Sequence, residues 1–144
     1  GKRLLDCGCG TGILSIVALK CGASHAIGYD IDEWSVYNAR HNAIINRVDE
    51  KFESVLGDAT VIPSIEGLFD IVVANILADV IIPMAPVIPA RMKKGAYFIT
   101  SGIIDFKENE VKEAIEKAAT YFSIEDGKIK IISAYIFGKG FFGL

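Results

Sequence analysis

Three glycines at alternate positions, directly after a short apolar segment, constrain this sequence more than any other feature. Residues Leu4–Gly12 read L-L-D-C-G-C-G-T-G, and an apolar pattern with helical spacing follows from Ile13. A buried strand that turns sharply into a helix has this form, because glycine accepts backbone conformations that a side chain disfavours. Such a turn lets backbone N–H groups approach a ligand at the positive end of a helix. The spacing differs from the G-x-G-x-x-G of dinucleotide sites, which would need a glycine at Ile13.

Composition indicates one globular domain. The chain has 144 residues, of which 51% are hydrophobic and 23% are charged, so a sizeable core can form. The net charge of −3 gives no strong signal for a nucleic-acid-binding face and makes a basic protein the easier partner. Nothing in the composition addresses the oligomeric state.

The three cysteines, Cys7, Cys9 and Cys21, are an odd number, which argues against a disulfide framework and for a reducing cytoplasm. We expect no metal, because small apolar cysteines suit a crowded turn and no second Cys/His cluster completes a site. The apolar stretch 69–90 is not expected to span a membrane, since it contains two aspartates and three prolines.

Strand and helix patterns alternate along the chain. The predicted strands are Arg3–Cys7, His25–Tyr29, Phe52–Leu56, Phe69–Ala74 and Ala96–Thr100. The predicted helical segments are Thr11–Cys21, Glu33–Asn46 with Asp32 as N-cap, Leu77–Ile82, Val87–Met92 and Lys107–Tyr121. The tail Ser123–Phe137 is predicted to form two strands around a turn at Asp126-Gly127.

Five β–α units followed by a hairpin predict an α/β fold in a single domain, residues 1–144. We expect a mostly parallel, open sheet of seven strands, with helices on both faces and an antiparallel hairpin at the C-terminus. Ligands of such sheets bind beyond the carboxyl ends of the strands.

Polar residues stand at or just beyond four of these strand ends: Asp6, Asp30, Asp58 and Asn75. Each has an ordinary structural alternative. Asp30 and Asp58 fit capping or turn roles, and Asn75 fits a helix N-cap. Their recurrence at four corresponding ends favours a binding site.

The D-x-G-x-G-x-G pattern after a strand resembles motif I of the Rossmann-like methyltransferases, which bind S-adenosylmethionine. The resemblance implies that Gly8, Gly10 and Gly12 cradle the methionine part of this cofactor. Asp6 would accept from its amino group, directly or through water. A glycine turn needed only for close packing of strand and helix is the alternative.

The same resemblance gives roles to the next two strand ends. Asp30 would accept the two ribose hydroxyls, a role shared with nucleotide dehydrogenases. Ile31 would lie against the adenine face or belong to the core. Asp58, followed by Ala59, would accept from the adenine amine.

The glycine turn indicates only this superfamily, but it stands with G-Y-D-I-D at 28–32 and G-D-A at 57–59. The more specific segments are A-N-I-L-A-D at 74–79 and S-G-I at 101–103. Together they resemble the PrmA family, whose members methylate amino groups of the eleventh protein of the large ribosomal subunit. The resemblance implies a protein N-methyltransferase with a ribosomal protein, in free form, as substrate. Asn75 would be its catalytic residue and would also contact the cofactor at the methyl-transfer site.

Members of this family carry an N-terminal substrate-recognition domain, and we expect this chain to be the catalytic core without it. Methylation of RNA or a small molecule is an alternative. Nucleic-acid amino-methyltransferases, however, typically show N-P-P-Y, with an aromatic residue that stacks on a base, where this chain has N-I-L-A. A cofactor-binding domain without catalytic activity is a further alternative, which the Asn75 region speaks against.

Overall fold

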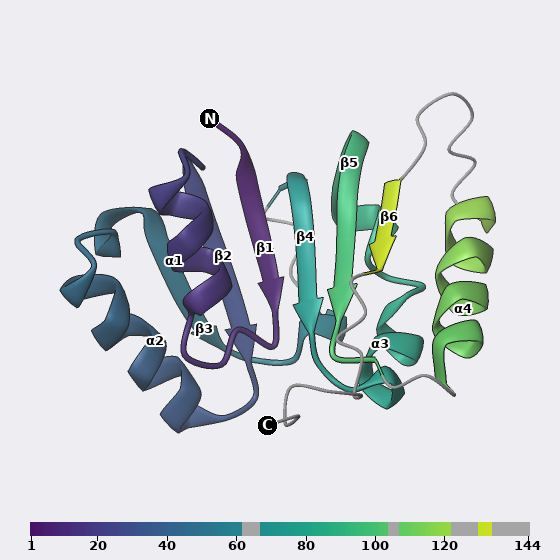
Figure 1. Ribbon diagram of the computed structural model, residues 1–144, viewed down its shortest axis with the longest axis horizontal. Helices are drawn as coiled ribbons and strands as arrows, with labels where there is room; N and C mark the ends of the chain where they lie inside the picture. The colour runs from purple at the N-terminus through teal and green to yellow at the C-terminus, as the bar shows by residue number, and fades with distance from the viewer. Residues whose placement is uncertain (62–66, 104–106, 122–129, 134–144) are drawn as a thin grey trace, which may run out of the picture.

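The computed structural model describes residues 1–61, 67–103, 107–121 and 130–133, and shows an open sheet with helices on both faces (Figure 1). The sheet order is β3-β2-β1-β4-β5-β6, and every adjacent pair is parallel. The strands are β1 (Arg3–Cys7), β2 (His25–Asp30), β3 (Phe52–Leu56), β4 (Phe69–Asn75), β5 (Met92–Ser101) and β6 (Lys130–Ser133). The helices are α1 (Ile13–Lys20), α2 (Glu33–Ile45), α3 (Ala78–Met84) and α4 (Glu108–Tyr121), with 3-10 turns η1 (Asp49–Lys51), η2 (Ala59–Val61) and η4 (Pro89–Arg91).

Most predicted elements are confirmed, and one helix is wrong. The segment Val87–Met92 is not a helix: it contains only the 3-10 turn η4, and β5 begins at Met92. Pro89 opens that short turn, and Met92 already has extended backbone angles. β5 begins earlier than predicted because Met92 pairs with Phe69 of β4. The sequence pattern of one segment cannot show pairing with a distant one.

The seventh strand and the C-terminal antiparallel hairpin are not seen in the described part of the chain. Asp126-Gly127 and most of the predicted tail lie outside the described residues. The described piece, β6, runs parallel to β5, with Tyr97 opposite Lys130. A parallel neighbour needs a crossover connection, and α4 lies between the two strands in sequence.

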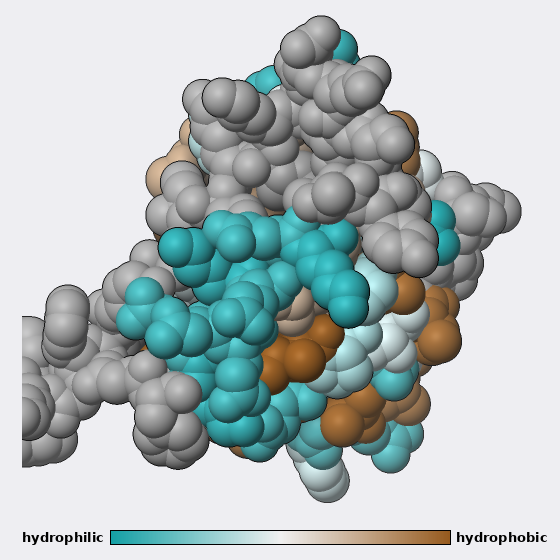
Figure 2. Space-filling view, turned by 90° about the vertical axis from the view of Figure 1, so that its right-hand side faces the viewer, coloured by the Kyte–Doolittle hydropathy of each residue, from teal (hydrophilic) through white to brown (hydrophobic). Residues whose placement is uncertain are grey.

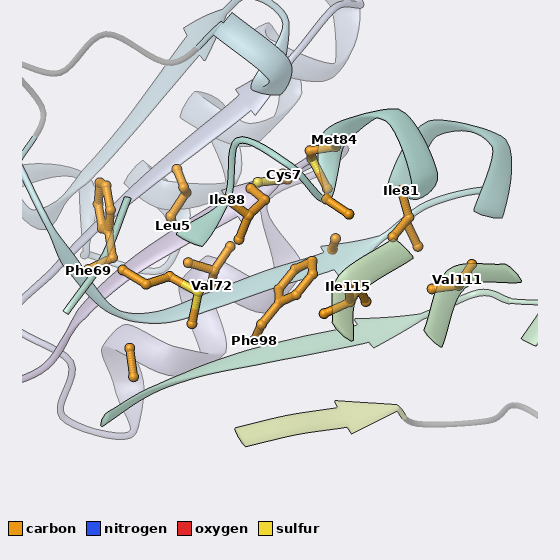
Figure 3. Close-up of a cluster of buried hydrophobic side chains, with 14 of the residues drawn as sticks. Leu5, Cys7, Phe69, Val72, Ile81, Met84, Ile88, Phe98, Val111 and Ile115 are labelled. Atoms are coloured by element: carbon orange, nitrogen blue, oxygen red, sulfur yellow. The ribbon is translucent and has the colours of Figure 1, made fainter. Parts of the chain in front are cut away.

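Successive side chains of a strand point to opposite faces of the sheet, so the apolar strand residues form two layers, one on each face. The larger layer packs strand residues such as Leu5, Val72 and Phe98 against α3 and α4 (Figure 3). The other packs Leu4, Ala26, Phe52 and neighbours against α1 and α2. Because both faces are covered, the central strands are apolar on both sides.

Helix α4 shows the expected amphipathic pattern. Val111, Ile115 and Ala118 are buried, whereas the glutamates between them are exposed. Figure 2 views the molecule from the side on which α4 lies, where hydrophilic residues surround smaller hydrophobic areas. No helix within the described ranges is long and apolar enough to cross a membrane.

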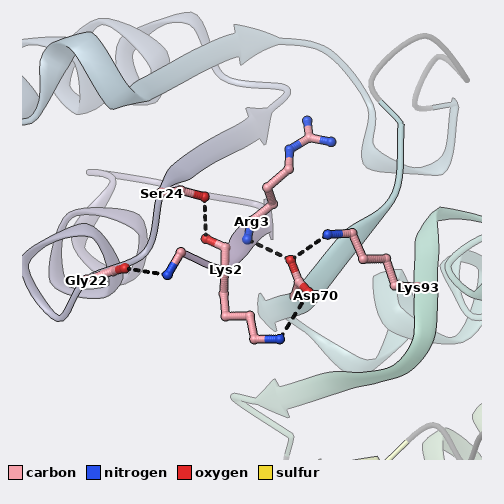
Figure 4. Close-up of polar contacts among 7 residues, drawn as sticks. Lys2, Arg3, Gly22, Ser24, Asp70 and Lys93 are labelled. Atoms are coloured by element: carbon pink, nitrogen blue, oxygen red, sulfur yellow. Dashed lines mark hydrogen bonds and ion pairs between the residues drawn. The ribbon is translucent and has the colours of Figure 1, made fainter.

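Asp70 ties together the amino ends of three strands (Figure 4). Its carboxylate accepts from the backbone N–H of Arg3 at 2.9 Å, from Lys2 Nζ at 3.3 Å and from Lys93 Nζ at 2.9 Å. The hydrogen bond from the Arg3 N–H and the two lysines lower the pKa of Asp70 to about 2. These contacts hold β1 and β5 against β4 at the amino ends of the strands, whereas the glycine turn lies at their carboxyl ends.

Candidate functional site

The turn after β1 is built from glycines in left-handed conformations. Gly8, Gly10 and Gly12 have φ angles of 75°, 53° and 79°, a region that disfavours a side chain. The N–H groups of Gly8 and Cys9 both donate to the carbonyl of Tyr29, at 2.8 and 3.0 Å. The end of β2 therefore holds the turn in place.

Two of these glycines are also required by their surroundings. A Cβ at Gly8 would overlap Ile76 Cγ2, and a Cβ at Gly12 would lie 2.7 Å from the ring of Phe52. A Cβ at Gly10 would meet nothing within 4 Å. The middle of the turn is thus the part whose backbone a ligand can approach.

Asp30 organises the turn as well as facing the cavity beside it. Its Oδ2 accepts from Gly10 N at 2.8 Å, and its Oδ1 accepts from Asp32 N at 3.0 Å. Each carboxylate oxygen has a second lone pair, so the group can still accept hydroxyl groups. The hydrogen bond from Gly10 N to Asp30 was not predicted from the sequence.

Asp6 is buried beneath the turn, with 1% of its surface exposed. Its Oδ2 accepts from Ser15 Oγ at 2.8 Å, and its Oδ1 has no hydrogen-bond partner among the described residues. Burial raises the pKa of Asp6 to about 6, although the hydrogen bonds from Ser15 act in the opposite direction. An unpartnered, buried carboxylate oxygen beneath the glycine turn suits a cationic group, directly or through water.

A cavity of about 170 Å³ opens between the loops that follow β1, β2, β3 and β4. It is lined by Gly8, Tyr29, Asp30, Ile31, Gly57, Asp58, Ala59, Thr60, Ile76, Val80 and Met84. Pockets that enclose a whole small molecule measure roughly 300–1,000 Å³. This one suits one end of a larger ligand, whose remainder would extend over the glycine turn.

The predicted residues fall into two groups. Gly8, Asp30, Ile31, Asp58 and Ala59 meet around this cavity. The others are not among its lining residues: Gly10 and Gly12 belong to the adjoining turn, Asp6 lies below it, and Asn75 stands exposed at the end of β4.

A purely structural role was the alternative at two positions, a turn for Asp58 and a helix N-cap for Asn75. Asp58 makes a local turn contact, since its Oδ1 accepts from Thr60 N at 2.7 Å, and it lines the cavity as well. Asn75 does not cap α3, because the N-cap is Leu77 and no side chain bonds there. The Asn75 amide is therefore not used by the helix that follows it.

Sequence reasoning missed Ser15 and Ile76. Ser15 is a fully buried hydroxyl on the face of α1 that packs on the sheet, so a polar residue within an apolar helical stripe was the available signal. Ile76 had no comparable signal, because its contact with Gly8 joins residues far apart in sequence.

Cys7 and Cys9 are structural. Both are buried and unpaired, and burial raises the pKa of both thiols, that of Cys9 to about 12. Such thiols stay protonated and are poor nucleophiles.

Comparison with known proteins adds a family. The family model described as ribosomal protein L11 methyltransferase (PrmA) matches residues 1–130. A ribosomal protein L11 methyltransferase of Agathobacter rectalis is 60% identical over 121 residues, which cover 80% of this chain and 38% of that protein. One of Lachnospira eligens is 50% identical over 123 residues, covering 81% and 39%. The chain thus spans about 40% of the length of these relatives.

Solved structures agree with the fold. A ribosomal protein L11 methylase of Lactobacillus delbrueckii subsp. bulgaricus superposes with a TM-score of 0.75 at 28% identity, over 81% of this chain and 59% of that one. A methyltransferase of Thiobacillus denitrificans, solved with S-adenosyl-L-homocysteine, superposes with a TM-score of 0.60 at 17% identity, over 67% and 40%. At that identity, the second match shows the fold alone.

Proposed function

The chain belongs to the PrmA family of ribosomal protein L11 methyltransferases, and from this premise we propose that it is the cofactor-binding and catalytic core of such an enzyme. The whole protein would transfer methyl groups from S-adenosylmethionine to amino groups of ribosomal protein L11. The match covers about 40% of the relatives, and a separate substrate-recognition part would account for some of their remaining length. We place the reaction in the cytoplasm, where free thiols such as Cys21 stay reduced.

The observation that carries the proposal is the unpartnered, buried Oδ1 of Asp6 beneath a turn of left-handed glycines. The cofactor's methionine part has an ammonium for Asp6, and its carboxylate would lie near the amino end of α1. Asp30 would accept the ribose hydroxyls, and Ile31, Asp58 and Ala59 would surround the adenine in the cavity they line. The residues present therefore fit the group.

When bound, this cofactor supplies a methyl group already activated by a positive sulfur, so the protein mainly aligns the acceptor and excludes water. Asn75 would hold the acceptor amine through its side-chain oxygen, because that oxygen accepts N–H groups. An amine attacks only in its neutral form, and desolvation beside a cation favours loss of its proton.

Calorimetric titration of this chain with S-adenosylmethionine and with NAD tests the cofactor assignment. We expect binding of S-adenosylmethionine and none of NAD at the same concentrations. Substitution of Asp30 by Ala should weaken the binding, and Asp49→Ala, an exposed carboxylate in η1, is the matched control. Preference for NAD would contradict the proposal.

Asn75→Ala in the full-length protein tests the catalytic role. We expect kcat for methyl transfer to ribosomal protein L11 to fall by about 100-fold, since misplaced reactants lose this much, while the dissociation constant for S-adenosylmethionine changes little. Equal losses in turnover and cofactor affinity would argue against the role given to Asn75.

A further inference from the structure

Gly102 follows the last paired residue of β5 and lies beside Asn75. The β4–β5 pairing ends with Asn75 opposite Ser101, so the chain leaves the sheet next to the Asn75 side chain. Gly102 has a φ of 79°, and Ile103 directly after it is buried. The backbone at Gly102 is therefore fixed from both sides.

The space that a side chain would take at Gly102 is occupied by the Asn75 amide. An ideal Cβ at Gly102 would lie 2.9 Å from Asn75 Oδ1, 3.3 Å from the carbonyl oxygen of Ile76 and 3.6 Å from its nitrogen. Real Cβ atoms essentially never come within 3.0 Å of such a neighbour. Of these three atoms, Oδ1 is the one that is approached most closely.

Asn75 Oδ1 is also the atom that can move at least cost. It is the end of an exposed side chain, and no described residue gives it a hydrogen bond that would hold it. A methyl group at position 102 would therefore displace the amide and leave the sheet largely as it is. The carbonyl of Ile76 needs to yield by only a few tenths of an ångström.

We propose that Gly102 is a positioning residue for methyl transfer: the absence of its side chain keeps the Asn75 carboxamide where it receives the acceptor amine. This inference rests on the proposed function of Asn75. Gly102 itself touches neither substrate nor cofactor in this account. Its effect on the rate should pass entirely through Asn75, because a shift of about 1 Å in a reacting group costs about 100-fold in rate.

Gly95, within β5, provides a matched control for Gly102, which directly follows that strand. Its φ is 77°, close to that of Gly102, but a Cβ there would meet nothing within 4 Å. Gly95→Ala and Gly102→Ala therefore impose a similar conformational strain, and only the second contacts Asn75. Comparing the two variants separates the contact from the backbone effect.

The experiment compares Gly102→Ala, Gly95→Ala, Asn75→Ala and the double variant Asn75→Ala/Gly102→Ala in the full-length protein. The measurements are kcat and KM with ribosomal protein L11, the calorimetric Kd for S-adenosylmethionine, and Tm. For Gly102→Ala we expect kcat to fall by about 100-fold, with the Kd within about twofold of wild type. Gly95→Ala should keep the wild-type kcat, and the double variant should be no slower than Asn75→Ala.

Several outcomes would overturn the inference. They are equal kcat values for Gly95→Ala and Gly102→Ala, a loss in Gly102→Ala confined to KM or Kd, and additive losses in the double variant. Failure of Gly102→Ala to fold, while Gly95→Ala folds, would also overturn it, because the Ile76 backbone would then be the limiting contact. If Asn75→Ala itself keeps wild-type kcat, the proposed function of Asn75 fails first.

Discussion

Asp6 is a buried carboxyl group in which Oδ2 accepts from the Ser15 hydroxyl and Oδ1 has no partner among the described residues. Its pKa rises from 3.8 to about 6 in the folded chain, mainly through burial. The folded state therefore holds this proton more tightly than the unfolded state. The free energy of unfolding should fall by about 3 kcal/mol as the pH rises from about 4 to 6, and stay level above that.

Urea unfolding of this chain at pH 4, 5, 6 and 7 measures this dependence. Asp6→Asn has a similar shape but does not titrate, so its unfolding free energy should lack the decrease that Asp6 contributes. A cofactor ammonium at Oδ1 would favour the ionised form, so affinity for S-adenosylmethionine should rise over the same range. Parallel pH curves for the wild type and Asp6→Asn would rule out the raised pKa.

The glycines of the turn should differ in their tolerance of a methyl group. Gly10→Ala adds only the cost of a left-handed alanine, about 1 kcal/mol, because its Cβ meets nothing. Gly8→Ala also overlaps Ile76, which adds about 1–3 kcal/mol. Chemical denaturation compares the two, and Ile76→Ala should recover part of the loss in a Gly8→Ala background. Equal destabilisation of the two single variants would refute the contact.

Among the elements, β1, β4 and β5 are held at their amino ends by Asp70. Its pKa is lowered, first by the hydrogen bond from the Arg3 N–H and then by Lys93 and Lys2. A lowered pKa gives stability that is present above pH 3.8 and is lost as the pH falls towards 2. Asp70→Asn should retain the hydrogen bond from the Arg3 N–H. Its stability should no longer fall as the carboxylate is protonated, because an amide does not titrate in this range.

Thermal unfolding between pH 2 and 5 tests this assignment, because the Asp6 effect has the opposite sign and its window lies higher. We expect the wild type to lose Tm towards pH 2 more steeply than Asp70→Asn. Lys94→Ala, an exposed lysine next to Lys93, is the control for general loss of positive charge. Equal slopes for wild type and Asp70→Asn would contradict the predicted role.

Element boundaries could be predicted wherever a local pattern decides them. The bounds of β1 and β3 are confirmed as predicted, and Asp32 caps α2 by accepting from Ser35 N at 2.8 Å. The amino end of β5 could not be predicted, since only Met92 pairs with β4 there and the register shifts before Tyr97, across the exposed residues around Gly95. Pairing between distant segments outweighs local propensity there.

At the scale of the molecule, it was predictable that Asp30 and Asp58 lie at one edge of the sheet, whereas the contacts around the cavity were not. Parallel strands bring their carboxyl ends to one edge, so Asp30 and Asp58 meet around one cavity although they lie 28 positions apart in the sequence. Three features depend on how loops from different strands pack. They are the hydrogen bond from Gly10 to Asp30, the burial of Asp6 and the close approach of Gly8 to Ile76. No single segment of the sequence carries that information.

The cavity joins loops from four strands, so a ligand bound there should stabilise the whole domain rather than one loop. At a concentration 100 times its Kd, a ligand that binds only the folded state adds about 2.7 kcal/mol to the free energy of unfolding. For a domain of this length, that corresponds to a rise in Tm of about 9 °C. Thermal unfolding of this chain with S-adenosylmethionine should show the shift, and the shift should be smaller in Asp30→Ala. NAD should leave Tm unchanged, and a shift confined to part of the transition would mean that the loops bind without engaging the sheet.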